Sequence, residues 1–243
     1  MSLPRSYAPD ADGTTVVLSS DESHHLLNVL RANTGDELLV FDGRGREWLA
    51  RVITVDRLRV MLNLVEPHAP AAEPPVAVTV AVGLLKSDQV SAVVRDATML
   101  GAAAVAAFVS DHTSVANQGR HGRSVERWQR VAIASAKQCR RAVVPAIHPV
   151  SGLDAVLAAE RGSKICCVEP GMAAHWPASS YARTDRPATA TVCIGPEGGW
   201  SAGDLECLHR HGATPLDLGP RTLRAETAPT VALSVLWSRW GWQ

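Results

Sequence analysis

The chain of 243 residues lacks the sequence features of membrane and secreted proteins. No stretch approaches the roughly 20 uninterrupted apolar residues that a bilayer-spanning helix needs. Residues 1–5 do not open a basic and then apolar signal segment. The five cysteines form no CxxC pair and are odd in number, so we interpret them as reduced core residues and not as a disulfide framework. We expect a cytoplasmic protein with no membrane partner.

Motifs of several cofactor-binding classes are also absent. No GxGxxG follows a predicted strand, which disfavours a Rossmann-type dehydrogenase, and the missing GxxxxGK disfavours a P-loop enzyme. His24 and His25 are adjacent on a predicted helix, and His209 and His211 are two positions apart, so neither pair converges on one helical face. We therefore predict no metal site.

Acidic residues are almost missing from residues 120–141, although the whole chain has a formal net charge of zero. This segment has Glu126 as its single acid and seven basic side chains: Arg120, Arg123, Arg127, Arg130, Lys137, Arg140 and Arg141. Five of them follow helical spacings and share one face, namely Arg123, Arg127, Arg130, Lys137 and Arg141. Such a face is usually only solvated, but the scarcity of acids favours contact with RNA phosphates.

Four prolines in residues 67–75 (PHAPAAEPP) predict a linker, because proline stiffens the chain and cannot donate to a sheet. Before it, Ser19 and Glu22 have the spacing of a capping box, which predicts a helix from Ser19 to about Arg31. Apolar patterning predicts four strands in the same region, at 14–18, 37–41, 48–55 and 58–65. We therefore predict a small β-rich domain over residues 1–70 and a second domain over residues 74–243.

After the linker, apolar strands alternate with helices. The strands are predicted at 76–82, 104–109, 164–168, 191–194 and 215–218. The helices are predicted at 87–100, 124–139, 201–211 and from about 227. This alternation predicts an α/β domain with a parallel sheet that is covered on both faces. In such a sheet the ligand site lies at the carboxyl ends of the strands.

Three loops that contain glycine and proline follow predicted strands, at 169–171, 195–199 and 219–228. Their glycines let the backbone approach a ligand closely, and their prolines stiffen the turns, which suits a nucleoside that is recognised by backbone groups. Alternatively, residues 195–199 form only a tight turn before a helix that Ser201 caps. The third loop carries ionisable residues, which favour a functional site over a simple turn: Arg221, Arg224 and Glu226.

Two of these loops, with their flanking residues, resemble those of a known family. Ile194-Gly-Pro-Glu-Gly-Gly-Trp-Ser201 and Leu218-Gly-Pro-Arg-Thr-Leu-Arg-Ala-Glu-Thr-Ala228 are similar to the paired motifs of the RsmE-type 16S ribosomal RNA uridine-N3 methyltransferases, which belong to the SPOUT superfamily. The resemblance extends to His25–Arg31 and Gln138–Arg141, and so to nearly the whole chain. It departs at Met99, where the family has an acidic residue, and at residues 112–114, where a more acidic and basic sequence is usual.

The resemblance implies a fold, a cofactor and a substrate. The implied fold is a PUA-like β-barrel that docks RNA, followed by a SPOUT parallel sheet with a C-terminal deep trefoil knot, in a homodimer. The implied reaction is S-adenosylmethionine-dependent methylation of N3 of a specific uridine in 16S ribosomal RNA, in the decoding-site region of the small subunit. Two other functions stay open: a SPOUT methyltransferase for another RNA position, and a non-catalytic RNA-binding protein of ribosome assembly.

Residue roles can be assigned to the matching positions. Glu226 or Glu197 is expected to accept the imide proton of uridine, and Arg224 to stabilise negative charge on the uracil oxygens. Glu226 is equally suited to a helix start, where the helix dipole favours a carboxylate. Cofactor contacts are expected from Val168, Glu169, Ile194, Gly195, Pro196, Glu197, Gly198, Gly199, Leu218, Gly219, Leu223, Arg224, Thr227 and Ala228. RNA contacts are expected from Arg5, His25, Arg31 and Arg44 of the small domain and from Arg123, Arg127, Arg130, Lys137 and Arg141.

Overall fold

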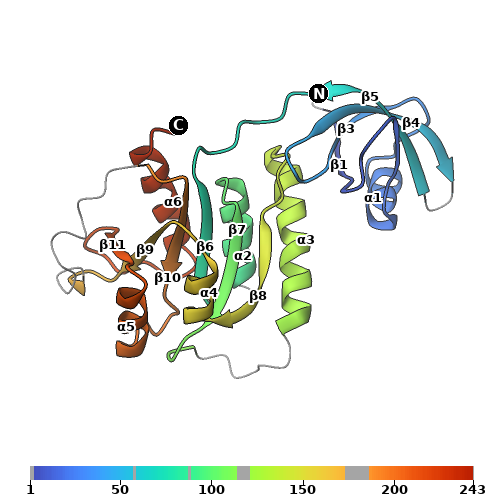
Figure 1. Ribbon diagram of the computed structural model, residues 1–243. Coiled ribbons are helices and arrows are strands. Elements are labelled where there is room, and N and C mark those ends of the chain that lie inside the picture. Colours follow the sequence, from blue (N-terminus) through green and yellow to red (C-terminus); the bar gives the residue numbers. More distant parts are fainter. Residues whose placement is uncertain (1–2, 57–58, 87–88, 114–120, 173–185, 243) are drawn as a thin grey trace. The chain divides into compact units, whose positions relative to one another are not determined.

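The computed structural model describes residues 3–56, 59–86, 89–113, 121–172 and 186–242, and the chain divides into two units (Figure 1). The first unit consists of Met1–Ala72 and Ile133–Val144, and the second consists of Glu73–Ala132 and Pro145–Gln243. Each unit has its own sheet and its own hydrophobic core. Among the described helices, none is long and apolar enough to cross a membrane.

The first unit is built on a five-stranded mixed sheet. Its strands are β1 (Arg5–Tyr7), β2 (Thr15–Val17), β3 (Glu37–Phe41), β4 (Glu47–Asp56) and β5 (Arg59–His68). They lie in the order β1-β3-β4-β5-β2, with β1 and β3 parallel and the other neighbours antiparallel. Along β5, Val60, Leu62 and Leu64 are buried and alternate with more exposed residues, as the period of two in an extended chain requires.

The predicted linker starts later than expected, because Pro67 and His68 form the end of β5. Pro67 lies opposite Trp48 of β4. On its other side, β5 pairs with β2 only as far as Asn63. The position of Pro67 therefore has a single neighbouring strand, and the sheet tolerates the missing N–H there.

The predicted N-terminal helix is present but is divided and shorter than expected. Ser19 caps α1 (Ser20–His24), because its Oγ accepts a hydrogen bond of 3.3 Å from the N–H of Glu22. The chain then continues as the π-helical segment η1 (His25–Val29). The helix ends before Arg31, whose φ of 56° is left-handed and cannot continue a right-handed helix.

Residues 133–144 belong to the first unit, whereas the sequence assigns them to the second domain. In this unit Phe41, Ala136 and Ala142 are buried in one apolar cluster. The Nζ of Lys137 also lies 2.8 Å from the carboxylate of Glu22. Burial of this apolar surface explains why residues 133–144 belong to the first unit. The composition of the linker does not indicate this contact.

Arg5 is one reason why residues 133–144 associate with the first sheet. Its side chain is buried, and the residue is only 8% exposed. Its Nη1 donates to the carbonyl of Ala136 at 2.9 Å, and its Nε donates to the carboxylate of Glu47 at 2.8 Å. Arg141 is buried as well. Neither guanidinium is exposed for an RNA phosphate in this structure, in contrast to the expectation from the sequence.

The second unit contains a six-stranded sheet. Its strands are β6 (Ala77–Gly83), β7 (Ala104–Val109), β8 (Ala146–Gly152), β9 (Ser163–Val168), β10 (Thr189–Ile194) and β11 (Thr214–Asp217). They lie in the order β11-β9-β10-β6-β7-β8, and every neighbouring pair is parallel. The predicted α/β fold with a parallel sheet is thereby confirmed.

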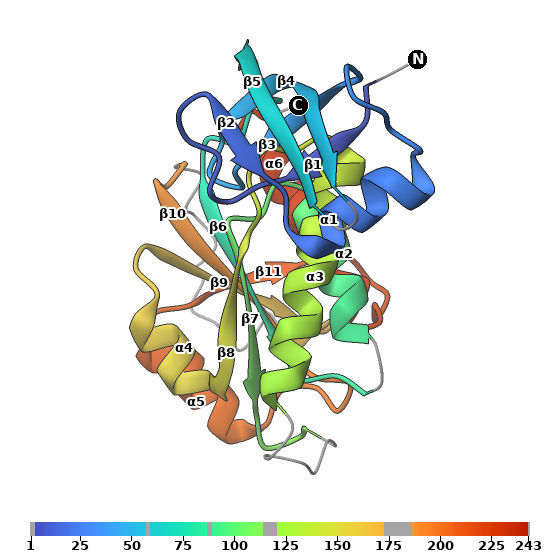
Figure 2. The same ribbon diagram turned by 90° about the vertical axis from the view of Figure 1, so that its right-hand side faces the viewer.

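Helices cover both faces of this sheet. The described helices with residues in this unit are α2 (Gln89–Met99), α3 (His121–Cys139, which from Ile133 on belongs to the first unit), α4 (Leu153–Ala159), α5 (Ala202–Arg210) and α6 (Ala228–Arg239). Helices α4 and α5 pack together on one face, and α2 and α6 pack together on the other (Figure 2). Phe108, Leu157 and Leu208 are fully buried in the core cluster of the α4–α5 face. The predicted start of α2 at Ser87 lies outside the described residues.

The sequence pattern does not reveal β8 or α4. Strand β8 contains His148 and Pro149 and lies at the edge of the sheet, where β7 is its single neighbour. Its residues are exposed or half-buried, so it needs no apolar run. Helix α4 is only seven residues long, too short for a clear helical period.

The cysteines are all free thiols, and Cys166, Cys167, Cys193 and Cys207 are buried. Burial raises the pKa of Cys167 to about 12, because a thiolate is costly away from water. These cysteines therefore fill the core as unreactive apolar groups, in agreement with the interpretation from the sequence.

Asp154, in the first turn of α4, links this helix to the end of α5. Its Oδ1 accepts hydrogen bonds from Nε2 of His211 at 2.9 Å and from Nη2 of Arg210 at 2.8 Å. The Sγ of Cys207 lies 3.6 Å from the same oxygen. These hydrogen bonds, that from His211 first, lower the pKa of Asp154 from 3.8 to about 2.

Replacing Arg5 by Met should lower the free energy of unfolding by about 3–5 kcal/mol, because Glu47 then stays buried without the guanidinium and keeps, among the described residues, only the exposed His68 as a partner. Urea denaturation measures this loss. The double variant Arg5→Met with Glu47→Leu should recover most of the stability, since it leaves no unpaired buried charge. A double variant as unstable as the single one would contradict this account of the pair.

The lowered pKa of Asp154 predicts a pH-dependent contribution to stability. A carboxyl group whose pKa falls on folding stabilises the protein above its unfolded pKa, and this contribution disappears as the pH falls through the folded value. Asp154→Asn should therefore melt below the wild type near pH 7, and the difference should narrow between pH 3.8 and about 2. Circular dichroism melts measure this difference, and a constant gap over that range would argue against a contribution from the carboxylate charge.

Candidate active site

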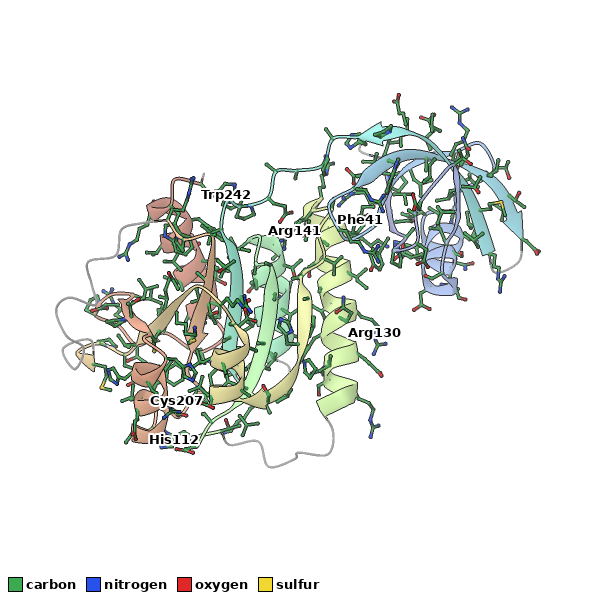
Figure 3. All side chains as sticks on the ribbon, viewed as in Figure 1. Phe41, His112, Arg130, Arg141, Cys207 and Trp242 are labelled. Atoms are coloured by element: carbon green, nitrogen blue, oxygen red, sulfur yellow. The ribbon has the colours of Figure 1, made fainter. Side chains whose placement is uncertain are left out.

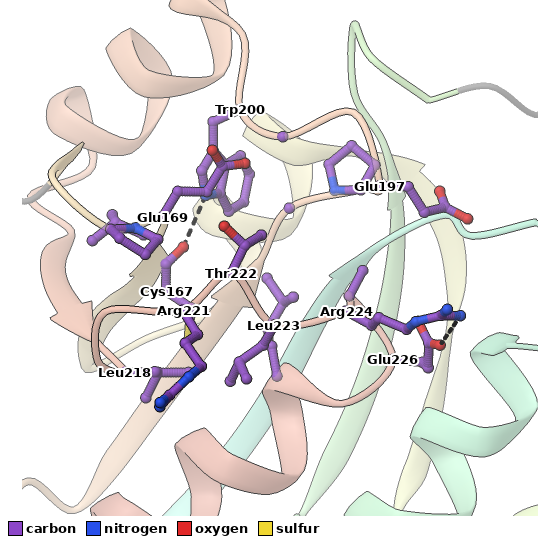
Figure 4. Close-up of a pocket in the computed structure, with 18 of the residues that line it drawn as sticks. Cys167, Glu169, Glu197, Trp200, Leu218, Arg221, Thr222, Leu223, Arg224 and Glu226 are labelled. Atoms are coloured by element: carbon purple, nitrogen blue, oxygen red, sulfur yellow. Dashed lines mark hydrogen bonds and ion pairs between the residues drawn. The ribbon is translucent and has the colours of Figure 1, made fainter.

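Four adjacent strands bring their carboxyl ends together at one end of the parallel sheet: β11, β9, β10 and β6. The loops that follow these strands line a pocket of about 390 Å³ (Figure 4). From β6 the chain adds β7 and β8 on one side. It then crosses to the other side, where it adds β9, then β10 between β9 and β6, and finally β11 beyond β9. The pocket therefore lies at the change of direction where open α/β sheets bind ligands.

Most of the residues that the sequence assigns to a cofactor line this pocket. The exceptions are Gly198 and Thr227, which do not line it. Glu226 lines it as well. The predicted cofactor residues that the structure brings together are Val168, Glu169, Ile194, Gly195, Pro196, Glu197, Gly199, Leu218, Gly219, Leu223, Arg224 and Ala228.

The pocket also has lining residues outside the predicted cofactor set: Gln89, Cys167, Pro170, Trp200, Arg221, Thr222 and Ala225, of which the sequence singles out Arg221 as an ionisable loop residue. Most of them are direct neighbours of predicted residues in the same loops, so a wider selection around each motif finds them. Gln89 is different, because it starts α2 after β6. It reaches the pocket because β6 pairs with β10, and that pairing is not visible in the sequence.

Trp200 joins three strands at one end of the pocket. Its Nε1 donates to the carbonyl of Cys167 at the end of β9, at 2.9 Å (Figure 4). Its ring stacks on Phe108 of β7, with a centroid distance of 5.9 Å and an interplanar angle of 8°. A Cβ atom on Gly195 would lie 3.1 Å from the ring, so the loop after β10 also packs closely against it. The indole thus fixes the spacing of the loops that it connects.

Glu197 is engaged in holding the start of α2. Its Oε1 accepts a hydrogen bond from the N–H of Lys86 at 3.0 Å. With its amide in the orientation that satisfies its neighbours, Gln89 donates to the same oxygen at 3.0 Å. Both hydrogen bonds commit this carboxylate oxygen to the start of α2.

Arg224 and Glu226 lie together at the other end of the pocket from Trp200 (Figure 4). Nη1 of Arg224 is 3.9 Å from Oε1 of Glu226. The arginine side chain is 82% exposed and the glutamate side chain 21% exposed, so the pair has a solvent-facing cation beside a half-buried carboxylate. The loop can follow this path because Gly219, which begins it, has a φ of 107° that other residues rarely adopt.

The predicted RNA-binding residues fall into different environments. Arg123, Arg127 and Arg130 are exposed on α3, and Arg130 projects from the helix away from the sheet (Figure 3). Lys137 on the same helix is instead paired with Glu22. In the first unit, Arg31 and Arg44 are exposed and His25 is half-buried. Arg120, which extends the basic segment in the sequence, lies outside the described residues.

One group among the described residues has the composition of a metal site, although the sequence predicts none. Potential ligand atoms of Asp154, Cys207 and His211 all lie within 4.8 Å of one another. Arg210, however, donates to the same oxygen of Asp154 that faces the other two groups. A metal cation there would meet a guanidinium at close range, so we assign this group to the packing of α4 against α5.

Comparison with known proteins identifies the family of the chain. A model described as an RNA methyltransferase domain matches residues 72–237, and a model described as an RNA methyltransferase PUA domain matches residues 18–64. Ribosomal RNA small subunit methyltransferase E from Synechocystis is 32% identical over 90% of this chain and 72% of the relative. The chain belongs to the ribosomal RNA small subunit methyltransferase E family. The family member from Mycobacterium tuberculosis is also 32% identical, over 96% of this chain and 90% of its own length.

Solved structures agree with this membership of the family. The crystal structure of a ribosomal RNA small subunit methyltransferase E from Neisseria gonorrhoeae, bound to S-adenosylmethionine, has a TM-score of 0.87 and 25% identity. The match covers 98% of both chains. A structure from Legionella pneumophila, in complex with the bound cofactor SAM, has a TM-score of 0.84 and 26% identity over 98% of both chains.

Proposed function

We propose that this protein uses S-adenosylmethionine to methylate N3 of a uridine in the 16S ribosomal RNA of the small subunit. The observation that carries the proposal is the pocket formed by the loops after β9, β10 and β11, which matches the position of ligand sites in parallel sheets. Two structural relatives of the whole chain are bound to S-adenosylmethionine. The choice of uridine N3 rests on the resemblance of the two loop motifs to that family.

The residues of the pocket fit a nucleoside sulfonium compound. A volume of about 390 Å³ is within the range of small-molecule sites. Ile194, Leu218 and Leu223 offer apolar surface for an adenine ring, and the glycines of the loops expose backbone N–H and C=O groups to it. The carboxylate of Glu169 suits a ligand that carries hydroxyl groups and a positive charge.

Glu226 is the proposed base, and Arg224 is its proposed partner in catalysis. The N3 imide of uridine must lose its proton before or as the nitrogen takes the methyl group that bound S-adenosylmethionine supplies. Glu226 accepts that proton, and the Arg224 guanidinium stabilises the negative charge that spreads onto the uracil oxygens. The half-buried position of Glu226 supports this choice over Glu197, whose oxygen already accepts hydrogen bonds at the start of α2.

RNA docking is proposed for both units. The PUA domain match in the first unit and the exposed Arg123, Arg127 and Arg130 on α3 support it. Arg31, Arg44 and His25 stay candidates for RNA contact, whereas Arg5, Arg141 and Lys137 serve within the first unit. A closed PUA-like barrel, a homodimer and a cytoplasmic location complete the proposal, as the resemblance implies.

A deep trefoil knot in the C-terminal part of the second unit is also proposed. The strand order supports it, because the chain passes from β9 to β10 and then to β11 on the far side of β9. The long loop after β11 also lines the same pocket as the loop after β10.

Methylation of small subunits that lack the modification tests the proposed function. The modified nucleotide should map by mass spectrometry to one uridine of 16S ribosomal RNA, with the methyl group on N3. A methyl group at another RNA position would instead establish a different target for the same pocket. Calorimetry without any S-adenosylmethionine binding would favour the non-catalytic RNA-binding alternative.

Glu226→Gln should reduce the rate of methyl transfer about 100-fold or more, because the amide cannot accept the imide proton. Its affinity for S-adenosylmethionine should change little. Single-turnover kinetics with small subunits measures the rate, and calorimetry measures the affinity. Glu206→Gln, the same change at an exposed position of α5, is the matched control and should keep the wild-type rate. A Glu226→Gln enzyme with wild-type rate would remove Glu226 as the base.

Charge reversal on α3 should weaken RNA binding and its dependence on salt. If Arg123 and Arg130 contact phosphates, the variant with both changed to Glu should show a slope of log affinity against log salt reduced by about 2. Fluorescence anisotropy over a salt series measures this slope. The control changes Arg161 and Arg239, both exposed, to Glu, which alters the net charge equally. Equal slopes in the two double variants would rule out a specific role of this face.

A further inference from the structure

Two residues of the loop after β7 form hydrogen bonds with the loop after β10. Nδ1 of His112 lies 3.0 Å from the carbonyl oxygen of Gly198 and 3.3 Å from that of Gly199. The neighbouring residue Asp111 accepts a hydrogen bond of 2.7 Å from Oγ of Ser201. Figure 3 shows His112 in this loop at the edge of the second unit. Two consecutive residues thus bind both ends of a four-residue segment.

The partners of His112 determine the role of its ring. Both are carbonyl oxygens, so Nδ1 must carry a proton and donate it. The neutral tautomer with a proton on Nδ1 can donate in this way, and so can the protonated ring. The contact therefore anchors the backbone of Gly198 and Gly199.

The backbones of the loop after β7 and the loop after β10 lie close together. A Cβ atom on Gly198 would lie 2.9 Å from Cβ of His112, which is closer than real side chains permit, and 3.2 Å from its carbonyl oxygen. This contact explains why Gly198 does not line the pocket: it faces the loop after β7. It also shows that the second glycine of the Gly195–Gly199 motif serves loop packing.

Ser201 makes the second anchor through the cap of α5. Its Oγ accepts a hydrogen bond from the N–H of Asp204 at 3.0 Å, and the Asp204 carboxylate accepts the N–H of Ser201 at 3.0 Å. The hydroxyl proton of Ser201 remains for Asp111. Asp111 thereby orients the hydroxyl so that its lone pair faces the helix, and it ties the capping box to the loop after β7.

The segment between the two anchors contributes directly to the pocket. Gly199 and Trp200 both line it. Because C=O and N–H point in opposite directions across a trans peptide, a Gly199 carbonyl held toward His112 keeps the N–H of Trp200 directed away from it. The anchors thus fix the orientation of backbone groups in the wall that a ligand meets.

We propose that His112 and Asp111 are positioning residues, which preorganise the Gly198–Ser201 segment for the methyl donor. This inference rests on the proposed function of the pocket. It gives a role to His112, the first of residues 112–114, where the chain departs from the sequence usual in the family; Ser114 lies outside the described residues. Preorganisation acts on the affinity for S-adenosylmethionine, because a loop that is already ordered loses less entropy on binding.

Calorimetry with S-adenosylmethionine tests the proposal on the full-length protein. His112→Ala should bind about fivefold more weakly than the wild type, which corresponds to the loss of one neutral hydrogen bond. His112→Asn should restore most of the affinity, because its side-chain N–H occupies the place of Nδ1–H. In methylation assays, His112→Ala should raise KM for S-adenosylmethionine and leave kcat within about twofold, because the ring does not touch the pocket.

The matched control is His24→Ala, the same change at an exposed residue of α1, which should bind like the wild type. Asp111→Ala should also weaken binding, with the thermal midpoint of each variant measured in parallel to confirm folding. Wild-type affinity in His112→Ala, or an Asn variant as weak as the Ala variant, overturns the inference and leaves the proposed function standing. Absence of binding by the wild-type protein overturns both.

Discussion

Parallel strand pairing around β10 is the constraint on which the rest of the second unit depends. Hydrogen bonds hold β10 between β9 and β6, so loops that lie far apart in the sequence meet at one end of the sheet. The pocket residues come from these loops, and no single segment could form the pocket alone. The position of β10 thus determines which residues can share a ligand.

Electrostatics then separates the roles of acidic residues that look alike in the sequence. Glu197 and Glu226 both lie in motif loops, but the first accepts main-chain and amide hydrogen bonds, while the second faces an exposed arginine. Asp111 connects the loop after β7 to the start of α5, and Asp154 connects α4 to the end of α5, each through hydrogen bonds. The pocket therefore combines Glu226 and Arg224, the proposed catalytic pair, with acidic residues such as Glu197 and Asp111 that fix the surrounding backbone.

The sequence predicts the parts of the fold that have a repeating apolar pattern and fails where tertiary pairing decides. Strands such as β7 and the three glycine-containing loops are predicted because buried parallel strands need continuous apolar runs. Strand β8 lacks such a run at the sheet edge, and Gln89 joins the pocket only through the pairing of β6 with β10. Charge patterns fail in a similar way: Arg5 reads as a surface cation, but its partners are Glu47 and main-chain carbonyls.

The strand order also bears on how the protein is made. Ala77 of β6 pairs with Thr189 of β10. The ribosome must therefore synthesise most of the second unit before this central pair of strands can form. Strands this far apart in the sequence pair slowly, because the chain between them must lose conformational entropy before their hydrogen bonds form. The wall contributed by residues 218–228 arrives later still. A nascent chain therefore holds no finished pocket, and ligand binding can begin only after translation has passed the last of these residues.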